Sequence, residues 1–436
     1  MRYHGRMDNE RKTLAIVGGG AAGLAAAVAA ARRLNALRRE GVRGIVPVDI
    51  VIYEADERVG RSILVTGNGR CNFSNARITG NVYRNGEFVS RALAELLNQG
   101  VERSDEAPAR ELQEHPICEF FSDLGLVWRE DDDGRLYPLA NKASSVLDVL
   151  RFACERLGVR EEREAEVVKI VPPSRSGERF HLRSGDGRVI HAQAVIVACG
   201  GRTDVEAMPS TYAHAPGRPV LGPLKTAEAV VKRLDNIRVR ASLSVVGPEG
   251  KQKARESGEL LFRSYGVSGI AVFNLSRFAC KGDALLVDFL PSEPKGERFL
   301  TSRRRRMVAG GLTLTCEDFL RGLLLPPVAR AVIGQAGLHP SSPFDEADVA
   351  PLARALKAFP LTVAGIGDPR QCQVTRGGYD VSLFDPSTME SRCDPGLYAV
   401  GEALDVDGPC GGYNLHWAWT SGILAGRSAV ERLAHA

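Results

Sequence analysis

The sequence predicts an α/β protein in which a first, sheet-based domain is interrupted by an inserted domain. Residues 12–60 read as strand, glycine turn, alanine-rich helix and second strand, which is a βαβ unit. The composition changes after about residue 203 and returns to its first character near residue 361. We therefore expect the first domain at residues 12–202 and 361–436, around an insert at residues 203–360.

Composition sets the broad class. The 436 residues are 44% hydrophobic, which is enough for a sizeable core. The nine cysteines occur singly, without a CxxC pair, so we expect a reducing cytoplasm and neither a disulfide framework nor a metal site. The N-terminus lacks an apolar signal core, and the longest run of small apolar residues, 21–31, is too short to cross a bilayer. A net charge of +4 neither requires nor excludes an acidic partner such as RNA.

The glycine turn of the βαβ unit carries the first site signal. Gly18, Gly20 and Gly23 follow a strand, open a helix and fit the spacing GxGxxG. The first glycine permits the turn, the second lets the backbone approach a pyrophosphate, and the third lets helix and strand pack closely. Ala22 lies in the same helix start, whose free amides and positive dipole end favour phosphate. The alternative interpretation is a glycine-rich turn that binds no nucleotide.

Glu54 strengthens the nucleotide interpretation. It ends the second strand, residues 48–54, where a carboxylate can accept both hydroxyls of an adenosine ribose. The separation from Gly23 is 31 residues, longer than the roughly 20 usual after this fingerprint. The basic loop between helix and strand accounts for the excess.

The remainder of the first domain is predicted in shorter elements. We expect helices at residues 88–99, 116–126 and 143–158, and a hairpin at 127–138 whose turn is "DDDG". Strands follow at 165–173, 179–184 and 189–201. The last of these runs through "AVIVA" into Gly200, which brings the chain back to the nucleotide site. Val168, in the strand at 165–173, is also assigned to the cofactor site.

The insert is predicted from its strands and helices. Residues 203–224 look loop-like, strands are expected at 237–247, 258–269 and 283–291, and residues 301–358 are mostly helical. The first character returns from "FPLTVAGIGD" at residue 359, followed by a strand at 396–402 and a glycine turn that opens the last helix. The small residues of that helix allow close packing: Ser421, Gly422, Ala425 and Gly426.

This second strand end suggests which dinucleotide binds. Gly401 and Glu402 end the strand. The following helix start at residues 411–414 suits an isoalloxazine, whose N1 and O2 carry negative charge when it is reduced. The residues assigned there are Gly411, Gly412 and Asn414. We therefore expect FAD stretched between two ends of one sheet. Only one GxGxxG occurs, so NAD(P)H is expected to dock transiently as electron donor, unless the donor is another protein.

Five long motifs resemble the BaiN-like bacterial flavoproteins, a family of NAD(P)/FAD-dependent oxidoreductases. They are "GRSILVTGNGRCNFSN", "GRLYP", "GVSGIAVFNLSR", "VTRGGYDV" with "TMES", and "GLYAVGEALDVDGPCGGYNLHWAWTSGILAG". The resemblance implies a Rossmann-like FAD-binding domain split by an inserted β-barrel-like domain with a small helical subdomain. It also implies several functions, since members include a reductase of 3-oxo bile-acid C=C bonds, proteins named after aminoacetone oxidation, and a ribosomal RNA dihydrouridine synthase.

In the light of this resemblance, "GNGRCNFSN" at residues 67–75 is interpreted as a loop beside the flavin. Gly67 and Gly69 let the backbone approach the cofactor, and Arg70 supplies a positive fork. Asn72 and Asn75 offer amides to hold a phosphate or oxyanion. Upstream, where the family pattern is often GRK, this chain has Arg61 and Ser62, so Arg61 is expected to carry more of the pyrophosphate contact.

The bile-acid and uracil reactions both reduce a C=C bond conjugated to a carbonyl. Hydride from reduced flavin N5 goes to the β-carbon, a donor polarises the carbonyl, and an acid protonates the α-carbon. Arg70 is the expected carbonyl or phosphate partner. Cys71, with a pKa lowered by Arg70, is the expected acid, with Cys410 and Tyr413 as alternates. The alternative for Cys71 is a small buried residue packed under the flavin, and for Tyr413 it is ring packing.

Three other features have open interpretations. The run "TSRRRRM" at residues 301–307 either binds RNA phosphates or forms a solvated helix face. His416, on the last helix, either assists the chemistry or is a helix-capping or packing residue. Trp417 and Trp419 are expected in the core. The leading hypothesis is an FAD enzyme that reduces an activated C=C bond in a small, steroid-like substrate. Uridine reduction in folded RNA and a low-turnover flavin redox sensor are the alternatives, and an amine oxidase is not excluded.

Overall fold

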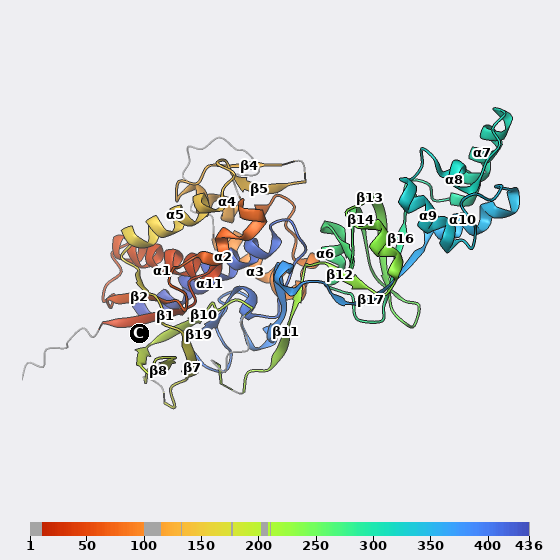
Figure 1. Ribbon diagram of the computed structural model, residues 1–436. Coiled ribbons are helices and arrows are strands. Elements are labelled where there is room, and N and C mark those ends of the chain that lie inside the picture. The colour runs from red at the N-terminus through yellow and green to blue at the C-terminus, as the bar shows by residue number, and fades with distance from the viewer. Residues whose placement is uncertain are drawn as a thin grey trace, which may run out of the picture. The chain divides into compact units, whose positions relative to one another are not determined.

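The computed structural model describes residues 11–99, 115–131, 133–175, 178–201, 208, 209 and 211–435 (Figure 1). The chain divides into two compact units, Met1–Arg218 with Val374–Ala436, and Pro219–Gln373. Each unit has its own hydrophobic core. The predicted α/β architecture with an inserted domain is confirmed.

A five-stranded parallel sheet forms the centre of the first unit, in the order β19-β10-β1-β2-β6. Its strands are β1 Lys12–Val17, β2 Val48–Tyr53, β6 Arg160–Glu162, β10 Ala194–Val197 and β19 Leu397–Ala399. All four residues of β10 are buried, as expected for a parallel strand that is covered on both faces. The carboxyl ends of β1, β10 and β19 therefore meet at one edge, where the site is built.

Two long helices, α1 Ala21–Arg39 and α11 Tyr413–Ala434, lie side by side against this sheet (Figure 1). Small residues permit the close approach. A Cβ on Gly422 would lie 2.4 Å from the Ala22 carbonyl oxygen, and one on Gly426 would lie 2.2 Å from the Ala26 carbonyl oxygen. The predicted close packing of the last helix is confirmed, and it sets the start of α1 beside Gly422, nine residues after the start of α11.

Three small sheets complete the first unit. They have the orders β3-β5-β4, β7-β8-β9 and β11-β18. Their strands are β3 Ser74–Asn75, β4 Trp128–Glu130, β5 Arg135–Pro138, β7 Val167–Val171, β8 Phe180–Ser184, β9 Val189–Ala192, β11 His214–Val220 and β18 Val374–Tyr379. The α-helices are α2 Arg61–Leu64, α3 Gly86–Gln99, α4 Pro116–Ser122 and α5 Ala143–Arg156, and the 3-10 helices are η1 Thr66–Gly69, η2 Gly80–Val82, η6 Val381–Leu383 and η7 Gly401–Ala403.

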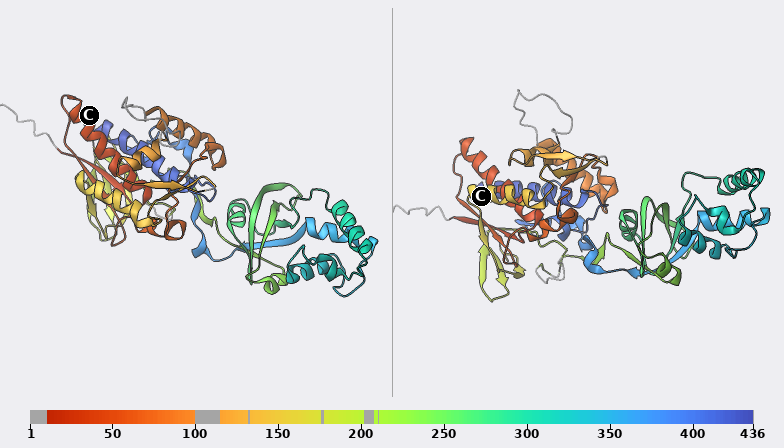
Figure 2. Two further views of the ribbon diagram at one scale, coloured as in Figure 1. Left: turned by 90° about the horizontal axis from the view of Figure 1, so that it is seen from above. Right: turned by 45° about the horizontal axis from the view of Figure 1, so that its top comes forward.

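The second unit is a closed six-stranded barrel with a group of helices inserted in the chain before its last strand. The inserted helices are drawn mainly in teal and light blue in Figure 2. The barrel order is β12-β15-β14-β13-β16-β17. Its strands are β12 Leu224–Thr226, β13 Arg238–Val246, β14 Gln252–Arg263, β15 Gly266–Ser268, β16 Ala284–Asp288 and β17 Phe359–Ile366. The helices are α6 Ile270–Ser276, α7 Gly296–Ala309, α8 Cys316–Leu320, α9 Pro326–Gln335 and α10 Val349–Lys357, with η3 Ala229–Leu234, η4 Glu346–Asp348 and η5 Pro369–Gln371.

The structure differs from the sequence analysis at both ends of the insert. Strand β17 was expected to return the chain to the first domain, but it closes the barrel against β12 and β16. Residues 214–220, expected in a loop, form β11. The hairpin at β4 and β5 is present, and the Gly134 N–H donates to the Asp131 carbonyl in its turn, although Asp132 lies outside the described residues.

Candidate cofactor and substrate site

The glycine turn after β1 has the geometry that its sequence predicts. Gly18 has φ +101°, and a Cβ there would lie 2.5 Å from the Ala198 carbonyl oxygen. A Cβ on Gly23 would lie only 2.0 Å from the Gly18 carbonyl oxygen. Gly20 is the N-cap residue of α1 and has no side chain to cover the first amides of the helix. The turn therefore presents backbone donors at the N-terminus of a 19-residue helix.

Glu54 lies beside this turn at the end of β2. Its Oε2 accepts a hydrogen bond from the Gly19 N–H at 2.7 Å, and its Oε1 accepts one from the Asp56 N–H at 2.9 Å. A carboxylate has about four acceptor positions, so two bonds leave capacity for hydroxyl donors. Glu54 thus fixes the turn and can also bind a ribose there.

The other residues assigned to this end of the site surround the turn. The Gly60 N–H donates to the Gly19 carbonyl, which places exposed Arg61 and Ser62, at the start of α2, next to the turn. Val168 lies in β7, whose approach is fixed by the Ala165 N–H donating to the Glu54 carbonyl. Gly200, at the end of β10, has φ +64°.

Gly401 brings the second strand end against the first. It follows β19 with φ +62°, and a Cβ there would lie 3.1 Å from the Ala22 Cβ at the start of α1. Its N–H donates to the Ser421 hydroxyl at 2.9 Å, and its carbonyl accepts from the Trp417 indole N–H at 3.0 Å. Two residues of α11 therefore hold Gly401 in place against the start of α1.

Glu402 is the titratable group at this junction. Its Oε2 accepts a hydrogen bond from the Thr375 N–H at 3.3 Å, and a Cβ on Gly201 would lie 3.0 Å from the same oxygen. Burial, with a smaller contribution from the Asp407 carboxylate, raises the pKa of Glu402 to about 7. The side chain can therefore act as a donor or an acceptor near neutral pH.

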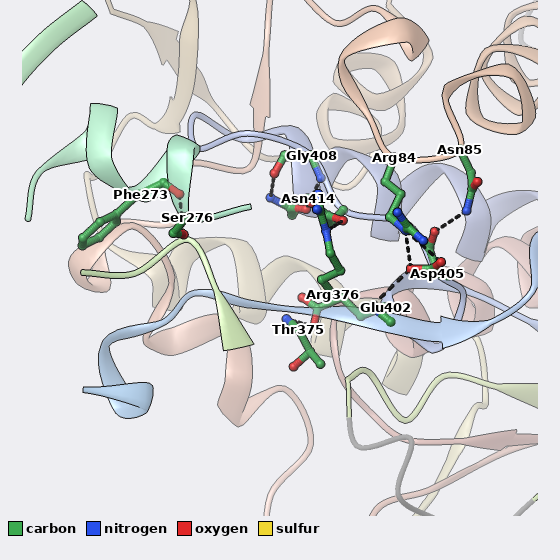
Figure 3. Close-up of polar contacts among 12 residues, drawn as sticks. Arg84, Asn85, Phe273, Ser276, Thr375, Arg376, Glu402, Asp405, Gly408 and Asn414 are labelled. Carbon is green, nitrogen blue, oxygen red and sulfur yellow. Dashed lines mark hydrogen bonds and ion pairs between the residues drawn. The ribbon is translucent and has the colours of Figure 1, made fainter. Parts of the chain in front are cut away.

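The loop from residue 405 to 412 is fixed by two aspartates. The Arg84 Nε lies 2.8 Å from both Asp405 carboxylate oxygens, and the Asn85 amide donates to the Asp405 carbonyl (Figure 3). Asp407 is fully buried, and Arg376 on β18 contacts it through two nitrogens, each at 2.9 Å. These paired charges lock the loop that precedes the first turn of α11.

The loop "GNGRCNFSN" packs directly on that first turn. The Asn75 amide donates to the Gly411 carbonyl at 2.9 Å, and a Cβ on Gly412 would lie 2.3 Å from the Ser74 carbonyl oxygen. The Trp419 indole N–H donates to the Phe73 carbonyl at 2.9 Å. The structure therefore joins the two longest motifs of the sequence into one site. Gly67 and Gly69, with φ +56° and +79°, shape the exposed side of the loop.

Cys71 is a small buried residue, as its alternative interpretation expects, and is not the activated thiol. Its backbone is left-handed, with φ +55°, and the residue is completely buried. Burial raises the pKa of the Cys71 thiol to about 12, whereas the prediction was a lowered pKa. Arg70 is exposed and its Cζ lies 5.0 Å from the centre of the Tyr137 ring. The left-handed residue turns two sequence neighbours to opposite environments, so the guanidinium does not activate the thiol.

Tyr413 is half-buried at the start of α11. Its ring packs edge-on against Tyr83, with ring centres 5.9 Å apart, and its hydroxyl donates to the Arg77 carbonyl at 3.5 Å. Burial raises the pKa of Tyr413, which keeps the phenol protonated at neutral pH. Cys410, the other alternate acid, is partly exposed in the same loop.

Asn414 holds the loop rather than projecting a free amide. Its Oδ1 accepts from the Gly408 N–H at 2.8 Å, and its Nδ2 donates to the Gly408 carbonyl at 3.0 Å (Figure 3). These bonds give the side chain a loop-positioning role, and the cofactor contact predicted for Asn414 stays a prediction. His416 is also a packing residue, since it is fully buried and its Nδ1 lies 2.8 Å from the Ser74 Oγ.

The arrangement fits FAD. Two helix N-termini, the Glu54 carboxylate with capacity for further donors, and a glutamate with a raised pKa lie toward the same edge of one parallel sheet. Among the described residues, the buried Asn72 Oδ1 at this edge has no hydrogen-bond partner. The α1 end suits the pyrophosphate and adenosine ribose, and the α11 end suits the negative charge of a reduced isoalloxazine.

Several residues of the site were not found from the sequence. Arg84, Asp405, Asp407 and Arg376 lie in quoted motifs or next to an expected helix, but no local pattern marks them as partners.

Within the described part of the chain, no three His, Cys, Asp or Glu side chains are placed to hold a metal ion. None of the described helices is long and apolar enough to cross a membrane.

The basic run "TSRRRRM" lies on α7 of the second unit and is neither a fully solvated face nor a uniform basic surface. Arg303 donates to the carbonyls of Phe319 and Arg321, at 3.2 and 2.7 Å. Arg304 donates to the Phe344 carbonyl at 3.3 Å. Two of the four arginines therefore attach α7 to its neighbours, and the other two, Arg305 and Arg306, are exposed.

Comparison with known proteins places the whole chain. A family model described as HI0933-like protein Rossmann domain matches residues 12–428. The chain is 33% identical to 3-dehydro-bile acid delta(4,6)-reductase of Clostridium scindens, over 96% of this chain and 99% of that protein. It is 27% identical to ribosomal RNA dihydrouridine synthase of Escherichia coli, over 94% and 96% respectively. One similar solved structure is 3-ketosteroid-delta4-(5alpha)-dehydrogenase from Rhodococcus jostii RHA1, with TM-score 0.45 and 16% identity over 96% of this chain and 97% of that chain.

Proposed function

Because this chain belongs to the HI0933-like Rossmann family, we propose that it is an FAD-dependent reductase of a C=C bond conjugated to a carbonyl in a small, steroid-like molecule. The observation that carries the substrate class is the 33% identity, over nearly the full length of both chains, to a 3-dehydro-bile acid delta(4,6)-reductase. The geometry supports the cofactor. Glu54 and the α1 N-terminus would bind the adenosine and pyrophosphate, while Glu402 and the α11 N-terminus would bind the flavin end.

Reduced FAD, when bound, would supply a hydride to the β-carbon of the substrate. The chain must then stabilise negative charge on the carbonyl oxygen and deliver a proton to the α-carbon. Tyr413 is the proposed proton donor, because a phenol is protonated at neutral pH and the side chain is only half-buried at the start of α11. Cys71 is no longer proposed for this role, since its thiol is buried in the core.

Arg70 is the proposed partner for the substrate carbonyl. Its guanidinium is exposed, its Nε donates to the Gly67 carbonyl at 3.3 Å, and its Cζ lies 5.0 Å from the centre of the Tyr137 ring. A charged planar donor of this kind stabilises a developing oxyanion. NAD(P)H is the proposed electron donor and would dock transiently, and the proposed location is the cytoplasm.

Reduction of uridine in ribosomal RNA is the second candidate. Ribosomal RNA dihydrouridine synthases of Escherichia coli and Haemophilus influenzae are 27% and 24% identical to this chain. Arginines that bind RNA phosphates must be accessible. Arg303 and Arg304 instead contact carbonyls of their own unit, which supports the small-molecule proposal over RNA. A low-turnover flavin redox sensor is the third candidate.

The test uses purified protein in three steps. Flavin is identified by absorption, the protein is reduced anaerobically with NADH and then with NADPH, and a 3-oxo-4-ene steroid or a uridine-containing RNA is added. The proposal expects the steroid to reoxidise the flavin and to gain two hydrogens by mass spectrometry. Reoxidation by RNA alone supports the second candidate, and reoxidation by neither supports the third.

A further inference from the structure

Asn72 has an unsatisfied polar atom at the junction of the two long motifs. The residue is 8% exposed, and its Oδ1 is buried without a hydrogen-bond partner among the described residues. Buried carbonyl oxygens in folded proteins nearly always accept a hydrogen bond, because an unmet acceptor loses its water without compensation. A donor from outside the chain would satisfy this atom.

The backbone around Asn72 is held in a costly conformation. Gly67, Asn68, Gly69 and Cys71 all have positive φ, between +55° and +79°. For a residue that is not glycine, a left-handed backbone costs free energy and persists only where the surroundings impose it. Here Cys71 supplies a small buried side chain, and the left-handed turn leaves Asn72 facing the start of α11.

Glycines keep the space around Asn72 clear. A Cβ on Gly412 would lie 2.9 Å from the Asn72 Oδ1, and a Cβ on Gly67 would lie 2.9 Å from the Asn72 backbone nitrogen. Asn75, three residues further on, differs in its bonding. Its Nδ2 donates to the Gly411 carbonyl and its Oδ1 accepts from the Arg77 N–H, each at 2.9 Å. One asparagine therefore holds the loop on α11, and the other points an unmatched acceptor at the same helix start.

The order of donors and acceptors matches the pyrimidine edge of a flavin. That edge presents the acceptors N1 and O2, then the donor N3–H, then the acceptor O4. The first amides of α11, a 22-residue helix capped by Gly412, are donors that suit N1 and O2. The neighbouring group, N3–H, requires an acceptor. We infer that Asn72 is a flavin-binding residue whose Oδ1 accepts a hydrogen bond from the N3–H of the isoalloxazine, an inference that rests on the proposed function.

The test compares FAD with 3-methyl-FAD, which lacks the N3 hydrogen. Flavin-free protein is titrated with each flavin, and the two dissociation constants are measured by flavin fluorescence. In the wild type we expect 3-methyl-FAD to bind about tenfold more weakly or worse, the effect of losing one buried hydrogen bond. In Asn72→Ala the two flavins should bind within about twofold of each other, because the acceptor is gone and the truncation leaves room for a methyl group.

Two further variants separate this role from loop packing. Asn75→Ala should weaken both flavins together and leave their ratio at the wild-type value, since both Asn75 amide atoms have partners within the protein. If Asn72→Ala does not fold, Asn72→Asp keeps an acceptor of the same shape and should keep the discrimination against 3-methyl-FAD. Equal binding of the two flavins by the wild type, or the same discrimination in Asn72→Ala as in the wild type, overturns the inference while leaving FAD binding intact. Failure to bind either flavin contradicts the proposed function itself.

Discussion

Replacing Gly23 with alanine tests the glycine turn against an opposing effect of known size. Alanine favours a helix over glycine by about 1 kcal/mol, so the substitution should stabilise α1 if space allows. The new Cβ would lie 2.0 Å from the Gly18 carbonyl oxygen, whereas Cβ contacts under 3.0 Å essentially never occur. The turn and the helix must therefore move apart by about 1 Å, and forced overpacking of this kind costs about 1–3 kcal/mol.

We expect Gly23→Ala to lower the free energy of unfolding by up to about 2 kcal/mol net. We also expect it to weaken FAD binding about tenfold or more, since the displaced amides are those expected at the pyrophosphate. Urea denaturation and flavin titration measure the two effects. Gly334→Ala is the matched control, because Gly334 is also helical but a Cβ there would meet nothing within 4 Å. That variant should gain up to about 1 kcal/mol and bind FAD normally. A Gly23→Ala protein that behaves like Gly334→Ala would refute the reasoning.

Three other substitutions probe the second end of the site. In the folded state Glu402 keeps its proton up to about pH 7, whereas its reference pKa is 4.5. The free energy of unfolding is therefore highest at low pH and falls as the pH rises from about 4.5 to 7. Glu402→Gln should remove this pH dependence from the free energy of unfolding measured by urea denaturation at several pH values. If the free energies of the variant and the wild type fall with pH in parallel, the assignment is contradicted. Arg376→Gln removes the guanidinium from the fully buried Asp407 carboxylate and should lower the free energy of unfolding by about 3–5 kcal/mol. The double variant with Asp407→Asn should recover part of this loss. A loss below about 1 kcal/mol would show that the ion pair is dispensable. Tyr413→Phe should lower kcat for enone reduction by about 100-fold or more with FAD still bound. Cys71→Ala should leave kcat within about tenfold of the wild-type value. A large loss in Cys71→Ala and a small one in Tyr413→Phe would instead identify the Cys71 thiol as the proton donor.

The sequence was informative where function follows a local pattern. The glycine spacing at residues 18–23 and the small residues near Gly422 act through backbone contacts within or between adjacent elements, so their presence alone predicts the geometry. Trp417 and Trp419 were predicted in the core because, two positions apart on a helix, they face different sides, and both are buried. Sequence patterns did not reveal that both indole N–H groups bind backbone carbonyls of the site, because those carbonyls belong to distant segments.

Other features depend on partners that sequence does not reveal. Arg84 and Asp405 are separated by 321 residues, and nothing near either position indicates the pairing. Cys71 follows Arg70 directly, which suggested an activated thiol, but a single left-handed residue sends the two side chains to different environments. In strand β17, buried residues alternate with more exposed ones, which fits a barrel strand. Its sequence also fits a return to the first domain. Only its pairing with β12 and β16 shows that the inserted domain continues through this strand.

Anaerobic reoxidation of the reduced flavin by a 3-oxo-4-ene steroid tests the central claim most directly. The account predicts that purified protein binds one FAD, that NADH or NADPH reduces it, and that the steroid returns the oxidised flavin spectrum while its C=C bond gains two hydrogens. A protein that binds no FAD, or whose reduced flavin remains reduced in the presence of the steroid, would contradict the account.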